Sequence, residues 1–133
     1  MRSSLAPAAC LVSALAVAPA LAEPPRISLV FGLDRMTVAA EDIRSVRRVD
    51  GQGQGAALVI RLAGRLDPVM SALTEAHVGE TGELLICNEL AVRPYLDAQI
   101  REAMFVISDT DIARIDRLQA MLTGPRCADR PGS

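Results

Sequence analysis

The sequence predicts an α+β fold, with a mainly antiparallel sheet of about five to six strands and two amphipathic helices packed on one face. Three observations lead to this prediction. Short apolar runs with period-two alternation are separated by turn residues. Two longer segments repeat apolar residues at helical spacing. Residues 51–55 contain three glycines and join two strand-like runs, as in a β-hairpin.

The first 22 residues have the pattern of a secretory signal peptide. They comprise one Arg near the start, an apolar stretch from Leu5 to Val17, and Ala20-Leu21-Ala22 as a small-x-small cleavage site. Pro7 and Pro19 interrupt a run too short to span a bilayer, which needs roughly 20 apolar residues. We therefore expect a periplasmic or otherwise exported chain, residues 23–133, without a transmembrane segment after cleavage.

The composition of residues 23–133 indicates one small domain with a short C-terminal tail and excludes a nucleic-acid binder. Without the leader, 13 Arg stand against 16 acidic residues, and the chain has no Lys. A phosphate-backbone binder shows a basic excess on one face. There is no Trp, one Tyr and two Phe, so a stacking platform for bases is not expected.

The first half of this domain alternates strands and turns. Residues Ile27 to Val38 predict one strand despite Gly32, and residues 39–43 predict a short helical turn. Two further strands, 45–50 and 56–62, flank the glycine-rich turn. Because these glycines lie between two strands rather than before a helix, they do not form a dinucleotide-binding loop.

The first helix is expected to begin at Asp67-Pro68, with Asp67 as the N-cap, and to end at Gly79. Its predicted apolar face consists of Val69, Leu73 and Ala76, with Met70 beside them.

The segment from Thr81 to Asp111 predicts three strands and the start of the second helix. Leu84 to Cys87 and the run ending at Pro94 are separated by a polar reversal, and Phe105 to Ser108 follow after a loop. The second helix is expected from about Asp109 to Leu122, capped by Ser108 or Asp109 and ended by Gly124-Pro125. Its apolar positions are Ile112, Ile115, Leu118 and Leu122.

Two cysteines follow the predicted signal peptide, Cys87 and Cys127. In an oxidising compartment we expect a disulfide between them, closing a loop of roughly 40 residues. The alternative is that Cys87 fills the core and Cys127 is a free thiol. No metal site is predicted, because His77, Cys87 and Cys127 lack the close pairing of structural zinc ligands.

No catalytic constellation is recognisable. His77 is the only histidine, Ser71 lies six positions earlier on another helix face, and no GxSxG motif occurs. We expect no catalytic residues and no cofactor. Arg44, Arg47 and Arg48 form a small basic cluster whose members strand geometry would divide between two faces.

Short motifs resemble the head subdomain of the first periplasmic domain of SecD, a membrane-embedded accessory of the Sec protein translocase. The resemblance extends from about Phe31 to Leu122. It rests on Glu41-Asp42-Ile43, Leu73-Thr74, Val78-Gly79, Leu84 with Ile86, Val92 before Pro94, Ile100 and Phe105 to Ser108. The chain departs from the family where Asp109 stands in place of a common Gly, and where Cys87-Asn88-Glu89 replaces an Asp-Gly-like reversal.

The resemblance implies a stand-alone, exported relative that does not catalyse a reaction but contacts translocating or unfolded polypeptide, or an envelope protein. The family's proton-driven activity belongs to transmembrane helices and is not carried over. A polypeptide segment could add to an exposed sheet edge. The expected edge consists of Ala91, Val92, Arg93, Pro94 and Tyr95. Two alternatives stay open, a small envelope hydrolase using a Ser with His77 and a structural module that self-associates.

Overall fold

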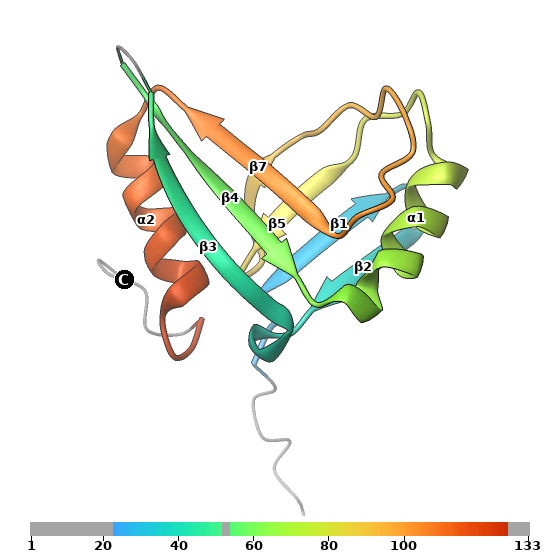
Figure 1. Cartoon of the computed structure of the whole chain (residues 1–133), viewed down its shortest axis with the longest axis horizontal. Coiled ribbons are helices and arrows are strands. Elements are labelled where there is room, and N and C mark those ends of the chain that lie inside the picture. Colours follow the sequence, from blue (N-terminus) through green and yellow to red (C-terminus); the bar gives the residue numbers. More distant parts are fainter. Residues whose placement is uncertain (1–22, 52–53, 128–133) are drawn as a thin grey trace, which may run out of the picture.

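The computed structural model describes residues 23–51 and 54–127, which form seven strands and two α-helices (Figure 1). The strands are β1 (Ile27–Phe31), β2 (Asp34–Val38), β3 (Ile43–Asp50), β4 (Ala56–Leu62), β5 (Glu83–Ile86), β6 (Glu89–Val92) and β7 (Met104–Asp109). The helices are α1 (Asp67–Ala76) and α2 (Ile112–Thr123), with 3-10 turns η1 (Ala40–Asp42) and η2 (Gly64–Leu66).

The strands form two antiparallel sheets, with orders β2-β1-β5-β6 and β3-β4-β7. The predicted α+β class is confirmed, whereas the prediction of one sheet with five to six strands is wrong. The two helices also do not share one sheet face. Helix α2 packs against β3, β4 and β7, while α1 lies beside β2 at the other end of the molecule (Figure 1).

The predicted strand from Ile27 to Val38 is a hairpin. Gly32 adopts a positive φ of 59°, which glycine tolerates without a Cβ penalty, and the chain reverses there. Strands β1 and β2 then pair antiparallel, with Ile27 opposite Val38. Leu29, Phe31 and Leu33 alternate with other residues in the sequence, as in a single strand. Leu33, however, lies at the tip of the hairpin and is fully exposed.

The three-stranded sheet confirms the predicted hairpin around residues 51–55, of which 52 and 53 lie outside the described part of the chain. Strand β4 is central and pairs with β3 and β7. Its alternate residues Leu58 and Ile60 are fully buried, because one face of the sheet turns toward the four-stranded sheet and α2.

Helix α2 begins at Ile112, three residues later than predicted. Asp111 is its N-cap, and the Asp111 carboxylate accepts a hydrogen bond from the Arg114 N–H. The side chains it buries against the sheets are Ile115, Leu118, Met121 and Leu122. Ile112, which was expected on this face, is 39% exposed.

Helix α1 begins at Asp67, as predicted, but its cap and its buried face differ from the prediction. Its N-cap is Leu66, and the Asp67 carboxylate accepts a hydrogen bond from the Ala103 N–H at 2.8 Å instead of capping the helix. The buried side chains are Met70 and Thr74, whereas Val69 is 45% exposed.

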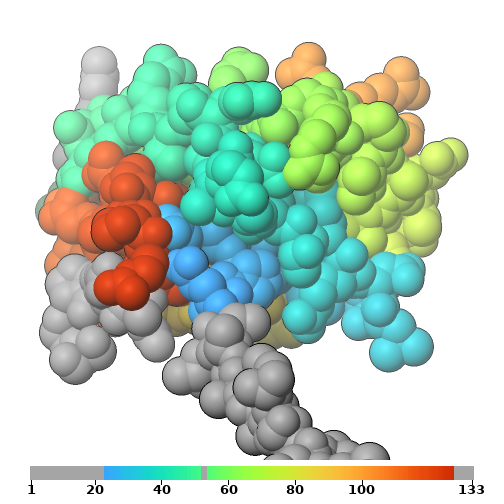
Figure 2. Space-filling model, turned by 90° about the horizontal axis from the view of Figure 1, so that it is seen from below, coloured from blue at the N-terminus to red at the C-terminus, as the bar shows by residue number. Residues whose placement is uncertain are grey.

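The N-terminal lead-in, the C-terminal end of α2 and the β5–β6 turn are joined at one corner. A disulfide links Cys87 to Cys127, with 5.4 Å between the Cα atoms. The Arg26 side chain, 3% exposed, donates hydrogen bonds to the carbonyl groups of Met121, Leu122, Gly124 and Pro125. Figure 2 shows the start of the described chain beside the end of α2. A cation here complements the partial negative charge of the helix C-terminus.

Candidate functional site

A small apolar hollow lies between β6 and β7, the end strands of the two sheets. Its volume is about 150 Å³, and all ten of its lining residues are apolar. They are Leu29, Phe31, Leu84, Val92, Pro94, Leu96, Ile100, Met104, Phe105 and Val106. An apolar cavity of about this size accommodates a benzene-sized group.

The hollow has a buried floor and an exposed rim. Phe31 is fully buried, and Leu29 and Leu84 are 2% exposed. At the rim, Val92 is 37% exposed and Val106 is 59% exposed. An apolar group entering from solvent would therefore meet aliphatic side chains first and the core after them.

Arg114 of α2 bonds the edge strands of both sheets, β7 and β6. Its Nη1 donates to the Asp109 carboxylate of β7 at 2.9 Å. Its Nη2 donates to the Leu90 and Ala91 carbonyl oxygens of β6, at 3.2 and 2.5 Å. The backbone N–H of Asp111 and this guanidinium lower the pKa of Asp109 below its ordinary 3.8. Two carbonyl groups of β6, those of Leu90 and Ala91, are therefore already bonded within the chain.

The loop that carries Ile100 into the hollow is fastened to α1 by polar side chains. Thr74 Oγ1 accepts a hydrogen bond from the Ile100 N–H at 2.8 Å and donates to the Met70 carbonyl. The Gln99 amide donates to Ser71 Oγ at 2.7 Å. Together with the bond from the Ala103 N–H to Asp67, these contacts position one wall of the hollow.

A second segment, residues 77–82, supports the wall formed by Pro94 and Leu96. The Gly82 N–H donates to the Pro94 carbonyl, and the Leu96 N–H donates to the Glu80 carbonyl. Gly82 lies so close to Phe31 that an added Cβ would stand 2.4 Å from the ring. A side chain at position 82 would therefore displace Phe31 from the floor of the hollow.

The five predicted edge residues run along the end of β6 and just beyond it. Ala91 is buried and its carbonyl bonds Arg114, so it is not open to a partner. Val92, Arg93 and Tyr95 are exposed, and Pro94 is half-buried beside the hollow. Residues from 92 onward thus form the accessible part of the predicted edge.

His77, the first residue of the segment 77–82, lies between the carboxylates of Asp34 and Glu80. Its Nε2 is 2.7 Å from Asp34 Oδ2, its Nδ1 is 3.0 Å from Glu80 Oε2, and its ring stacks on Phe31. Because neutral imidazole donates from one nitrogen only, this arrangement favours the imidazolium. The hydrogen bond to Asp34, followed by that to Glu80, raises the pKa of His77 above its ordinary 6.5. Both ring nitrogens are thus occupied, which gives no support to the serine hydrolase alternative.

Other parts of the described chain offer less chemistry. Beside the β3–β4 connection lie two depressions that are larger and more open than the hollow, with volumes of about 450 and 550 Å³. Both are lined partly by Gly51, Gln54 and Gly55. Among residues 23–51 and 54–127, no three His, Cys, Asp or Glu side chains are grouped to hold a metal ion. The described helices include none with the length and apolarity needed to cross a membrane.

Sequence reasoning did not identify several residues that form the site. Leu96, Ile100 and Met104 lie in or next to an irregular loop, where no periodicity marks a buried face. Arg114 follows the Asp109-Thr110-Asp111 turn, and this proximity of opposite charges was the one available signal.

Comparisons with known proteins support the fold alone. No protein-family model matches the chain, and no curated protein matches it. Among solved structures, it is similar to SecDF, described as a membrane component that enhances protein export, with a TM-score of 0.55 and 12% identity. The match covers 66% of this chain and 40% of that one. SecDF in a super-membrane-facing form gives the same TM-score and identity, with 66% of this chain and 12% of the other covered. The chain therefore has a SecD-like fold.

Proposed function

We propose that this protein is an exported, non-enzymatic accessory module that binds an extended polypeptide segment at the hollow between β6 and β7. The observation that carries the proposal is a hollow lined by ten apolar residues, beside two strands that each end a sheet in the described chain. An extended segment presents side chains alternately to opposite sides, so every second one can enter such a hollow.

Strand addition supplies the remaining contacts. Backbone groups of an added strand bond a sheet edge, while pockets for alternate side chains give specificity. On β6 the accessible stretch begins at Val92, because Arg114 bonds the Leu90 and Ala91 carbonyls. A bound segment would therefore run along Val92 to Tyr95 and place one apolar side chain over Phe31.

The similarity to SecDF supports an export-related role for this binding. The SecDF structure is described as a component that enhances protein export, and this chain spans 40% and 12% of the two matched chains. An exported location agrees with the Cys87–Cys127 disulfide, which persists in oxidising compartments. The predicted signal peptide, residues 1–22, lies outside the described residues.

A fluorescent octapeptide that alternates Val and Thr would test the proposal. Its binding, measured by fluorescence anisotropy, should weaken about tenfold or more in a Val92→Asp variant, because a carboxylate at the rim costs free energy when it is desolvated. Val69→Asp is a matched control, since Val69 is 45% exposed on α1 away from the hollow. Equal binding by both variants and the wild type would refute the proposed site.

A further inference from the structure

The outer face of the three-stranded sheet is a second surface with a defined pattern. The strand registers arrange nine outward residues in three rows. The rows are Val49, Ala57, Ser108; Arg47, Val59, Val106; and Ser45, Arg61, Met104. In sequence they alternate with the buried Leu58, Ile60 and Ile107, so they lie on the opposite side from the core. Figure 1 shows α2 and the four-stranded sheet behind this sheet, with no described element over its front.

Five of the nine positions form an apolar stripe that crosses the sheet diagonally from Val49 to Met104. The stripe consists of Val49, Ala57, Val59, Val106 and Met104, of which the last two, on the edge strand β7, also border the hollow. Val49 is 42% exposed and Val106 is 59% exposed. With strands about 4.8 Å apart and a rise of about 3.4 Å per residue, the stripe is about 17 Å long.

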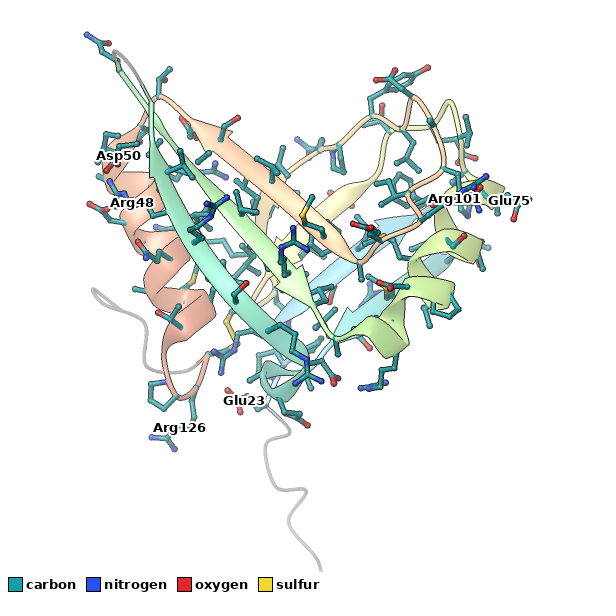
Figure 3. All side chains as sticks on the ribbon, viewed as in Figure 1. Glu23, Arg48, Asp50, Glu75, Arg101 and Arg126 are labelled. Carbon is teal, nitrogen blue, oxygen red and sulfur yellow. A yellow bond between two sulfur atoms is a disulfide. The ribbon has the colours of Figure 1, made fainter. Side chains whose placement is uncertain are left out.

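Two arginines border the stripe along the same side. Arg47 lies next to Val59, and Arg61 lies between Ser45 and Met104. Neither forms an ion pair with any described residue, although the whole sequence contains 16 acidic residues. No acidic residue occurs among the nine. Arg48, on the inner side of β3, differs because it pairs with Asp50 and Asp116. Figure 3 shows Arg48 and Asp50 near α2.

We propose that this outer face binds an amphipathic helix of a partner protein, with acidic residues along one flank of the helix. A sheet face with an apolar stripe is stabilised by a further layer packed on it. A helix rises 1.5 Å per residue, so about 11 residues cover the stripe. The acidic flank would pair with Arg47 and Arg61, which lack partners in the described chain.

The same observations disfavour two other occupants. A second copy stacked with its own outer face would bring arginines together without an acid between them, and like charges across an interface oppose association. Recognition of an anionic membrane surface uses clusters of 4–8 basic residues. This face has two, and no aromatic residue among its nine positions.

A pair of designed peptides tests the proposal. The first is a 14-residue helical peptide with Leu at positions 3, 6, 7, 10 and 14 and Glu along one flank, and the second carries Lys in place of each Glu. Titration of ¹⁵N-labelled protein should shift the amides of β3, β4 and β7 with the Glu peptide. The Lys peptide should bind at least tenfold more weakly. The double variant Arg47→Glu/Arg61→Glu should lose at least tenfold in affinity for the Glu peptide.

Controls separate this surface from the hollow and from unfolding. Arg35→Glu reverses an exposed charge on β2 and should leave binding unchanged, as should Val92→Asp at the hollow. Melting temperatures verify that each variant is folded. Failure of the Glu peptide to bind, or equal binding of both peptides, would overturn the proposal. So would binding to vesicles containing phosphatidylglycerol without binding to the peptide, or a dimer in light scattering that the double variant abolishes.

Discussion

The two sheets share one core, but their anchors differ. The three-stranded sheet is held by long ladders, with seven residue pairs between β3 and β4 and six between β4 and β7. The four-stranded sheet has shorter ladders, with only three pairs between β5 and β6. Its anchors are the disulfide at Cys87, the buried Arg26 before β1, and His77 against β2.

This difference indicates which half of the molecule responds to conditions. Backbone ladders and aliphatic packing do not titrate and are not reduced, whereas a disulfide and a charged histidine respond to thiols and to pH. Strand β6 begins two residues after Cys87 and ends at Val92, where the accessible edge at the hollow begins. We therefore expect reduction, or a rise in pH through the pKa of His77, to alter the four-stranded sheet and its binding edge before the three-stranded sheet.

Removing the disulfide should have the largest effect on stability. In the chain-entropy model, closing the loop from Cys87 to Cys127 contributes about 4 kcal/mol to the free energy of unfolding. A Cys87→Ala/Cys127→Ala variant should lose a corresponding amount in urea denaturation. Amide exchange should rise in β5 and β6 more than in β3 and β4. An unchanged midpoint would show that the disulfide does not stabilise this fold.

Replacing the buried Arg26 should have the second-largest effect on stability. Arg26→Met removes the donor to four carbonyl groups near the C-terminal end of α2. We expect a loss of about 2 kcal/mol in the free energy of unfolding, since a hydrogen bond to a charged group contributes roughly 1.5–3 kcal/mol. Arg35→Met, an exposed change on β2, should stay within about 0.5 kcal/mol. Similar losses in the two variants would argue against the anchoring role of Arg26.

Raising the pH should destabilise the protein through His77. The pKa of His77 is raised in the folded state. Its contribution to the free energy of unfolding is therefore complete below about pH 6.5 and is lost as the pH rises through the folded-state pKa. Urea midpoints should therefore fall as the pH is raised above 6.5, and less so in a His77→Gln variant. His77 is the only histidine in the sequence, which leaves few other groups titrating in this range. The same fall in both proteins would contradict this origin.

Substitutions on the outer face should have the smallest effect on stability. Arg47 and Arg61 are exposed, and neither has an ionic partner among the described residues. Arg47→Ser and Arg61→Ser should each change the free energy of unfolding by no more than about 0.5 kcal/mol. A loss above about 1 kcal/mol in thermal or urea denaturation would show that this face contributes to the fold itself.

Local patterns predicted most strands, but not how the strands are divided between sheets. The glycines around residue 53 and the alternation in β4 are local signals, and the predicted hairpin is present. Alternation shows which residues share a strand face, but it does not determine the neighbour of each strand. The alternation also continued through Leu33, which concealed the turn at Gly32.

The site was harder to predict because it depends on tertiary contacts. Helix α1 buries Thr74 rather than Val69, since the Thr74 hydroxyl bonds the distant Ile100 N–H. The hollow combines β1, β5, β6, β7 and the loop before β7. Apolar periodicity and helix-capping residues depend only on residues that are close in sequence. A site built from several separate segments therefore leaves no local pattern. Of the predicted edge, Val92, Arg93 and Tyr95 are exposed, while Ala91 is buried.

The most direct test of the central claim is to map where an extended peptide binds the wild-type protein. ¹⁵N-labelled protein would be titrated with the alternating Val and Thr octapeptide, and amide shifts would be followed for each residue. We expect the largest shifts at Val92 to Tyr95, with the exception of Pro94, which has no N–H, and at Met104 to Val106. Shifts confined to β2, α1 or α2, or no shifts at millimolar peptide, would contradict binding at the hollow.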